Sequence, residues 1–139
     1  MIDEGVRITL GSDAPVEGIN PLSGFHAAIT RVTSDGDSPH GPGGWFPEQK
    51  ISRREALRGK MAISFKPSSK KADTQVILGM TIDPAYASFT DDILGSIVPG
   101  KRADFVMFSQ DIMEVPANQI LKTKVLATVM DGKAVYGAL

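Results

Sequence analysis

The feature that most constrains the fold of this chain is a short, mostly apolar segment that is followed by an aspartate. Residues 6 to 10 are mostly apolar or β-branched, Gly11 breaks the run, and Asp13 stands where the chain turns. This pattern predicts a short buried strand that ends at a loop, as strands do in βα-repeat proteins. Side chains at such a strand end meet ligands, because the turn exposes them above the packed sheet. Asp13 can therefore bind a metal ion, accept a proton from water, or only stabilise the local turn.

The next segment carries the signals of one helix. Asn20 offers a side-chain cap, and Pro21 suits the first helical position, where its missing N–H costs nothing. Apolar residues then recur at helical spacing: Leu22, Phe25, Ile29 and Val32. We expect a helix from about 21 to 33 with one apolar face. His26 lies beside that face, and we interpret it as structural.

A long loop and a second helix are predicted to follow. Residues 34 to 47 are rich in Gly and Pro, and Trp45 and Phe46 at their end are expected to pack against the protein. His40 is interpreted as a loop residue, because a metal site needs several convergent ligands and the chain holds only two histidines. Ser52-Arg53-Arg54-Glu55 is a capping box, which predicts a helix that starts at Ser52.

The C-terminal part has the pattern of short strands and turns. Residues 95 to 101 mimic a phosphate-binding loop, but Arg102 stands where that motif needs Ser or Thr. The next residues, 105 to 108, predict a strand, whereas a phosphate loop opens a helix, so we reject a nucleotide site. Two apolar segments around Asp131-Gly132 predict a β-hairpin over residues 125 to 136, since both turn residues tolerate positive φ.

Composition narrows the function classes. The 139 residues suffice for one domain with a real core, and a net charge of −1 argues against a nucleic-acid partner. No apolar run is long enough to span a bilayer, and the first residues lack the pattern of a signal peptide. We therefore expect no membrane partner and a cytoplasmic location, although the compartment itself stays open. Without cysteine, disulfides and thiolate ligands are excluded.

The chain resembles the C-terminal part of amidohydrolase family 3 in blocks that follow the family's order. The first block is residues 11–16, Gly-Ser-Asp-Ala-Pro-Val, with 20–22, Asn-Pro-Leu, and 28–31, Ala-Ile-Thr-Arg. The second is residues 47–52, Pro-Glu-Gln-Lys-Ile-Ser, with 55–57, Glu-Ala-Leu. The third is residues 94–106, Leu-Gly-Ser-Ile-Val-Pro-Gly-Lys-Arg-Ala-Asp-Phe-Val, closed by 128–133, Thr-Val-Met-Asp-Gly-Lys.

This resemblance implies an α/β fold and a division of the chain. Residues 1–93 correspond to the last βα unit of a TIM-like amidohydrolase barrel, and residues 94–139 to part of the accompanying β-sandwich. Residues 60–79 interrupt the family pattern and are interpreted as an atypical insertion. An intron translated in frame and a genuine surface insertion both remain explanations for it.

The resemblance also implies hydrolysis of a non-peptide carbon–nitrogen bond in a small amide-type substrate, with a divalent metal, expected to be zinc. An Asp that ends the eighth strand binds metal and shuttles the proton in the family, and it maps onto Asp13. Arg31 matches a family position where a guanidinium could hold a substrate carboxylate, and a solvated charge at a helix end is the equal alternative.

The family's histidine ligands would lie before Met1. We therefore expect a fragment that is inactive alone and binds no catalytic metal tightly. The alternative is a non-catalytic module that binds a partner through exposed sheet edges.

Overall fold

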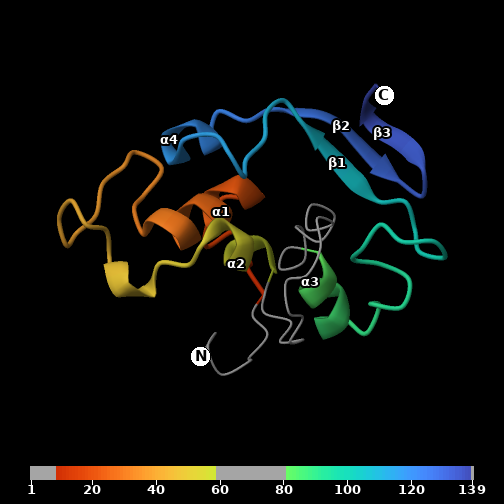
Figure 1. The fold of residues 1–139 in the computed structure, drawn as a ribbon, viewed down its shortest axis with the longest axis horizontal. Coiled ribbons are helices and arrows are strands. Elements are labelled where there is room, and N and C mark those ends of the chain that lie inside the picture. The colour runs from red at the N-terminus through yellow and green to blue at the C-terminus, as the bar shows by residue number, and fades with distance from the viewer. Residues whose placement is uncertain (1–8, 59–80, 139) are drawn as a thin grey trace, which may run out of the picture.

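The computed structural model describes residues 9–58 and 81–138. Its elements in chain order are α1 (Pro21–Thr30), the 3₁₀ turn η2 (Pro47–Gln49), α2 (Arg53–Arg58), α3 (Ile82–Ala87), β1 (Phe105–Phe108), α4 (Ala117–Ile120), β2 (Val125–Met130) and β3 (Lys133–Gly137). Helix α1 contacts both α2 and α4, while the three strands form a sheet at the other end of the molecule (Figure 1). The fold is thus a mixture of helices and one small sheet. No helix in the described ranges has the length and apolar character that a membrane span needs.

Helix α1 begins where the sequence predicts and ends earlier. The Asn20 side chain accepts a hydrogen bond from the Leu22 N–H at 3.1 Å, which confirms the predicted cap. The helix stops at Thr30 instead of continuing to about residue 33, because Arg31 adopts a left-handed conformation with φ 61°. The Arg31 N–H still reaches the Ala27 carbonyl at 2.8 Å, so the last turn is closed.

The capping box of α2 forms with both of its reciprocal bonds. The Glu55 carboxylate accepts from the Ser52 N–H at 2.7 Å, and the Ser52 hydroxyl accepts from the Glu55 N–H at 3.2 Å. These contacts satisfy two amides that the first helical turn leaves without partners. The helix then turns Ala56 and Leu57 inward, and both are buried.

One apolar core joins the helices to a segment far along the chain. Its buried members are Leu22, Phe25, Ala56, Leu57, Ile112 and Ile120. Phe25 from α1 and Ile120 from α4 are fully buried, so this cluster connects residues on both sides of the predicted boundary at 93/94. The apolar faces of α1 and α2 therefore pack against each other and against residues 112–120.

The sheet is antiparallel with the order β1-β2-β3. Asp131 and Gly132 join β2 to β3 with φ values of 50° and 73°, which confirms the predicted hairpin. A register shift between Met107 and Phe108 interrupts the pairing of β1 with β2. Such a shift changes the face to which the next side chain points, and Phe108 packs against the helical core.

The predicted N-terminal strand is wrong within the described residues. Thr9 and Leu10 belong to no strand, and residues 6 to 8 of that prediction lie outside the described ranges, as do residues 60–79. A parallel strand is held by hydrogen bonds to neighbouring strands, and strand pairing in the described ranges involves only β1, β2 and β3.

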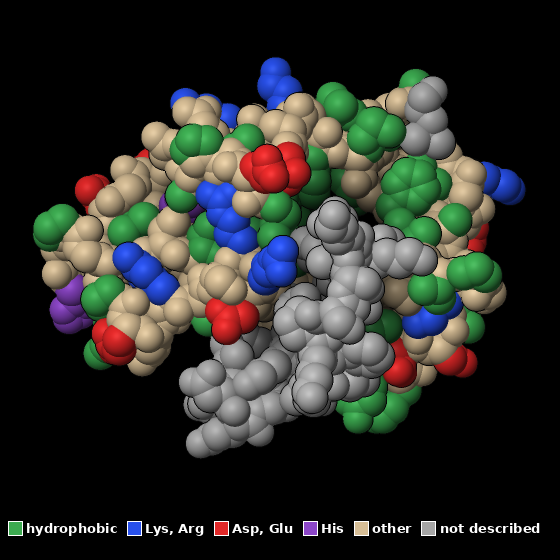
Figure 2. Space-filling model, viewed as in Figure 1, with side chains coloured by type: hydrophobic (Ala, Val, Ile, Leu, Met, Phe, Trp, Pro, Cys, Tyr) green, Lys and Arg blue, Asp and Glu red, His purple; other side chains and the backbone are tan. Residues whose placement is uncertain are grey.

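Residues 95 to 101 form no phosphate loop. The strand β1 follows them, as predicted, and the Lys101 ammonium group donates to the carbonyl oxygens of Leu94, at 3.1 Å, and Asp91. The lysine thus closes its own turn. Basic and acidic side chains are mixed on the face shown in Figure 2, in line with the balanced net charge.

Candidate functional site

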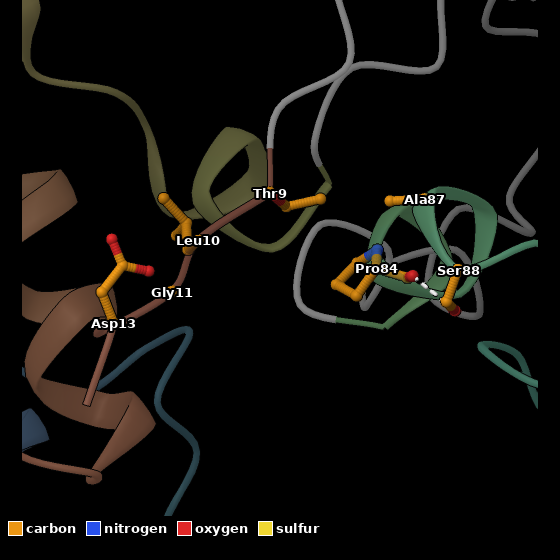
Figure 3. A pocket seen from close by; sticks show the side chains of 7 residues that line it. All are labelled: Thr9, Leu10, Gly11, Asp13, Pro84, Ala87 and Ser88. Carbon is orange, nitrogen blue, oxygen red and sulfur yellow. Dashed lines mark hydrogen bonds between the residues drawn. The ribbon is translucent and has the colours of Figure 1, made fainter. Parts of the chain in front are cut away.

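Asp13 lies at a shallow, open hollow of about 540 Å³. Residues 9–11 and Asp13 form one side, and Pro84 and Ala87 of α3, with Ser88 directly after it, form the other (Figure 3). These two segments are far apart in the sequence, so the hollow exists only in the folded chain. Its lining combines the Asp13 carboxylate and the hydroxyl-bearing side chains of Thr9 and Ser88 with small and apolar residues.

A tight turn sets the position of Asp13. The Asp13 carbonyl accepts from the Val16 N–H at 3.0 Å, and the Ser12 carbonyl accepts from the Glu17 N–H at 3.1 Å. Asp13 itself has a φ of 49°, which Asp tolerates better than most residues. Its side chain is exposed, and no hydrogen bond joins its carboxylate to another part of the described chain. The carboxylate is thus available for a ligand, as a site residue requires.

The α3 wall was not found by sequence reasoning. The Ser88 hydroxyl lies 2.9 Å from the Pro84 carbonyl, 3.0 Å from the Ala85 carbonyl and 2.9 Å from the Thr90 hydroxyl. These contacts hold it against the end of α3, so Ser88 shapes the hollow and is not placed as a nucleophile. Nothing in the sequence indicates that this helix would face Asp13, because only tertiary packing brings the two together.

Arg31 does not line the hollow. It follows α1, and its Nε donates to the Trp45 carbonyl at 2.9 Å, with the guanidinium 5.5 Å from the centroid of the Trp45 ring. The structure therefore does not bring Arg31 and Asp13 to one site in the described residues. Its predicted role in holding a substrate carboxylate stays a prediction.

The two histidines also lie away from the hollow. His26 is buried in α1, where its Nδ1 is 3.5 Å from the Thr30 hydroxyl, and burial lowers its pKa. His40 stacks on Trp45 with ring centroids 6.4 Å apart. Residues 9–58 and 81–138 contain no group of three or more His, Asp or Glu residues that could hold a metal ion. These residues alone do not fit a catalytic metal, which takes three protein ligands in a zinc site.

The sequence of this chain is similar to those of known proteins. The model of the amidohydrolase family matches residues 1–136. The chain is 32% identical to Protein LONG AFTER FAR-RED 3 of Arabidopsis thaliana, over 98% of this chain and 19% of that protein. It is 29% identical to an N-substituted formamide deformylase of Arthrobacter pascens, over 98% of this chain and 20% of the relative.

A third relative is the putative amidohydrolase YtcJ of Bacillus subtilis (strain 168), 26% identical over 98% of this chain and 21% of the relative. The chain thus spans about a fifth of the length of these curated relatives. No solved structure matches it. Because the family model covers nearly every residue, the chain belongs to the amidohydrolase family.

Proposed function

We propose that this chain contributes Asp13 to an enzyme that hydrolyses a carbon–nitrogen bond in a small amide-type substrate. The observation that carries the proposal is the family match over residues 1–136, within which Asp13 presents an exposed carboxylate to a hollow. Two of the three relatives are named for chemistry on amides. Those names do not favour the alternative of a non-catalytic module that binds through its sheet edges.

Asp13 would act on the proton of the attacking water. Amide hydrolysis needs a group that removes this proton and returns it to the leaving nitrogen, and a carboxylate within hydrogen-bond reach can do both. The hollow is open beside Asp13, so water and a small substrate have access to it. Ser88 and Ala87 would bound the space for the substrate from the side of α3.

A divalent metal, zinc, is the cofactor that we propose for the full-length protein. One carboxylate is a single ligand, and the described residues supply no set of three. The remaining ligands would have to come from those parts of a full-length family protein that lie outside the region matched by this chain. We therefore expect the 139-residue chain alone to be inactive and to retain no catalytic metal after dialysis.

We also propose a composite role for the chain. We propose that residues 1–93 form the end of a TIM-like barrel and that residues 94–139 form part of a β-sandwich beside it. The sheet lies wholly in the second part, and α1, α2 and α3 lie in the first. The core that joins α1 and α2 to Ile112 and Ile120 would then fix the barrel end to the sandwich.

The test is Asp13→Asn in a full-length amidohydrolase that contains this chain. We expect kcat to fall by about two to four orders of magnitude with the fold intact, because the amide cannot accept the proton. Asp35→Asn is the matched control, since Asp35 is exposed and lies away from the hollow. Unchanged kcat in Asp13→Asn, at saturating metal, would refute the assignment.

A further inference from the structure

Two reciprocal hydrogen bonds join Arg31 to Trp45. The Trp45 N–H donates to the Arg31 carbonyl at 2.7 Å, and Arg31 Nε donates back to the Trp45 carbonyl at 2.9 Å. Residues 32–44 are the loop that lies between them, and we name it the closing loop. Its two ends are thus tied at the C-terminal end of α1.

The Arg31 guanidinium makes a second contact with the same partner. It lies 5.5 Å from the centroid of the Trp45 indole ring, within the range of a cation–π interaction. A planar guanidinium can donate through Nε while its face lies near an aromatic ring. A lysine ammonium is a point charge and cannot reproduce both contacts with one geometry.

The backbone at this junction leaves no space for a side chain on Gly44. A Cβ built on Gly44 would lie 2.8 Å from the Thr30 carbonyl oxygen and 3.0 Å from that of Arg31. Its φ of 89° also favours glycine. Arg31 and Phe46 have positive φ as well, at 61° and 49°. Such conformations persist where the surrounding contacts hold them, which indicates a closely held junction.

Aromatic rings gather on the outer side of this junction. His40 from the closing loop stacks on Trp45 at an interplanar angle of 18°, and Trp45 and Phe46 have centroids 5.2 Å apart. Trp45 is 48% exposed and Phe46 is 45% exposed. The rings therefore form a half-exposed surface whose position depends on Trp45.

We propose that Arg31 is a positioning residue that closes the loop onto α1 and thereby holds the rings of His40, Trp45 and Phe46 in one fixed cluster. The guanidinium is oriented by the carbonyl and ring of Trp45, and Gly44 permits the approach of the backbone. This role does not depend on the hydrolytic function proposed above, because none of these residues lines the Asp13 hollow.

The chain provides its own probe, since Trp45 is its single tryptophan. Arg31→Ala removes the Nε bond and the ring contact, and Arg31→Lys keeps only the charge. Arg102→Ala is the matched control: Arg102 is a half-exposed arginine that pairs with Asp131 at 3.2 Å, away from the closing loop. The measurements on the 139-residue chain are acrylamide quenching of Trp45 emission and hydrogen exchange of the Trp45 amide.

We expect Arg31→Ala to raise the quenching constant by up to about twofold, because the half-exposed ring becomes free. Exchange protection of the Trp45 amide should fall by about 5- to 30-fold, the factor expected for the loss of one or two kcal/mol of local stability. Arg31→Lys should lie between Arg31→Ala and the wild type, and Arg102→Ala should match the wild type. If Arg31→Ala loses its helical circular dichroism, Arg31→Lys decides the outcome.

Unchanged quenching and unchanged exchange in the folded Arg31 variants would overturn the proposal. So would a wild-type chain in which Trp45 is quenched as readily in buffer as in guanidinium chloride. A third contradiction would come from Arg31→Lys if it leaves Trp45 quenching in the 139-residue chain unaltered but raises KM in a full-length enzyme. That result would assign Arg31 to a substrate carboxylate instead.

Discussion

Arg53 Nη1 donates a hydrogen bond to the Ile112 carbonyl oxygen at 2.8 Å, although 59 positions separate the two residues. Nη2 of the same guanidinium donates to the Val115 carbonyl. These bonds connect the first turn of α2 to the segment that carries Ile112, a buried member of the core. One side chain thus satisfies two carbonyl groups beside the apolar cluster that unites the helices with residues 112–120.

Arg53→Lys should therefore destabilise the chain although it keeps the charge. An ammonium group cannot serve both carbonyls with the geometry of the guanidinium fork, so we expect a loss of about 1–3 kcal/mol in the free energy of unfolding. Urea titration followed by circular dichroism measures this loss. Arg54→Lys is the control, because Arg54 is exposed on the same helix. Equal unfolding midpoints for the two variants would contradict the prediction.

Gly95→Ala should disturb the packing of α3. A Cβ at Gly95 would lie 2.7 Å from the Ile82 Cα and 2.9 Å from the Ala85 Cβ, and the φ of 81° disfavours alanine. We expect a cost of about 2–5 kcal/mol from the clash and the strained backbone together. Thermal unfolding monitored at 222 nm checks the direction.

Gly24→Ala is the matched glycine variant with the opposite expected sign. Gly24 lies on the exposed side of α1, and beyond its chain neighbours and its own helical backbone a Cβ there would meet no atom within 4 Å. Replacing a helical glycine by alanine restricts the unfolded chain, so the free energy of unfolding should rise by about 0.5–1 kcal/mol. A stabilised Gly95→Ala variant, or a destabilised Gly24→Ala variant, would show that the packing around these residues is misjudged.

His26 should make the stability of the chain depend on pH. Burial lowers the pKa of His26 below 6.5, so the unfolded state binds this proton more readily than the folded state. The stabilisation is therefore present above about pH 6.5 and is lost as the pH falls through the lower folded-state pKa. Urea midpoints measured at several pH values should show this slope in the wild type.

The comparison of the two histidines isolates the effect. His26→Gln should remove the part of the slope just below pH 6.5, whereas His40→Gln should keep it, because His40 is exposed. A wild type and a His26→Gln variant with parallel pH profiles would exclude His26 as the source.

Residues 60–79 are predicted to be dispensable for the fold. Their removal joins Gly59 to Met80 and restores the continuous family pattern, and they lie outside the described ranges. A deletion variant should keep the Arg53-dependent stability described above, because Arg53, Ile112 and Val115 remain. Sequencing of the mature messenger tests the origin: a transcript without these codons confirms an intron, and one that retains them indicates a genuine insertion.

Local chemistry was readable from the sequence wherever the partners are near neighbours along the chain. The Asn20 cap, the Ser52–Glu55 capping box and the Asp131-Gly132 turn all formed as predicted. Each depends on backbone groups within a few positions, so the residue types are sufficient to specify it. The same logic placed Asp13 at an exposed turn.

Predictions that depended on distant partners were less complete. The strand ending at Leu10 was wrong in its described part, since a strand requires hydrogen bonds from neighbours that the pattern cannot identify. The sequence also predicts an end of α1 that is too late. Arg31 adopts a left-handed conformation, and its carbonyl accepts a hydrogen bond from the Trp45 N–H, a partner that lies beyond the loop.

The sequence by itself determined the family and the local signals: where helices begin, which turn closes the hairpin, and which carboxylate stands at a turn. Only the tertiary structure decided which of these elements meet. It placed α3 opposite Asp13, Arg53 against Ile112, and Trp45 against Arg31. The physical reason is that burial of apolar surface is non-directional, so it drives the helices together without specifying from the pattern alone which side chains will touch.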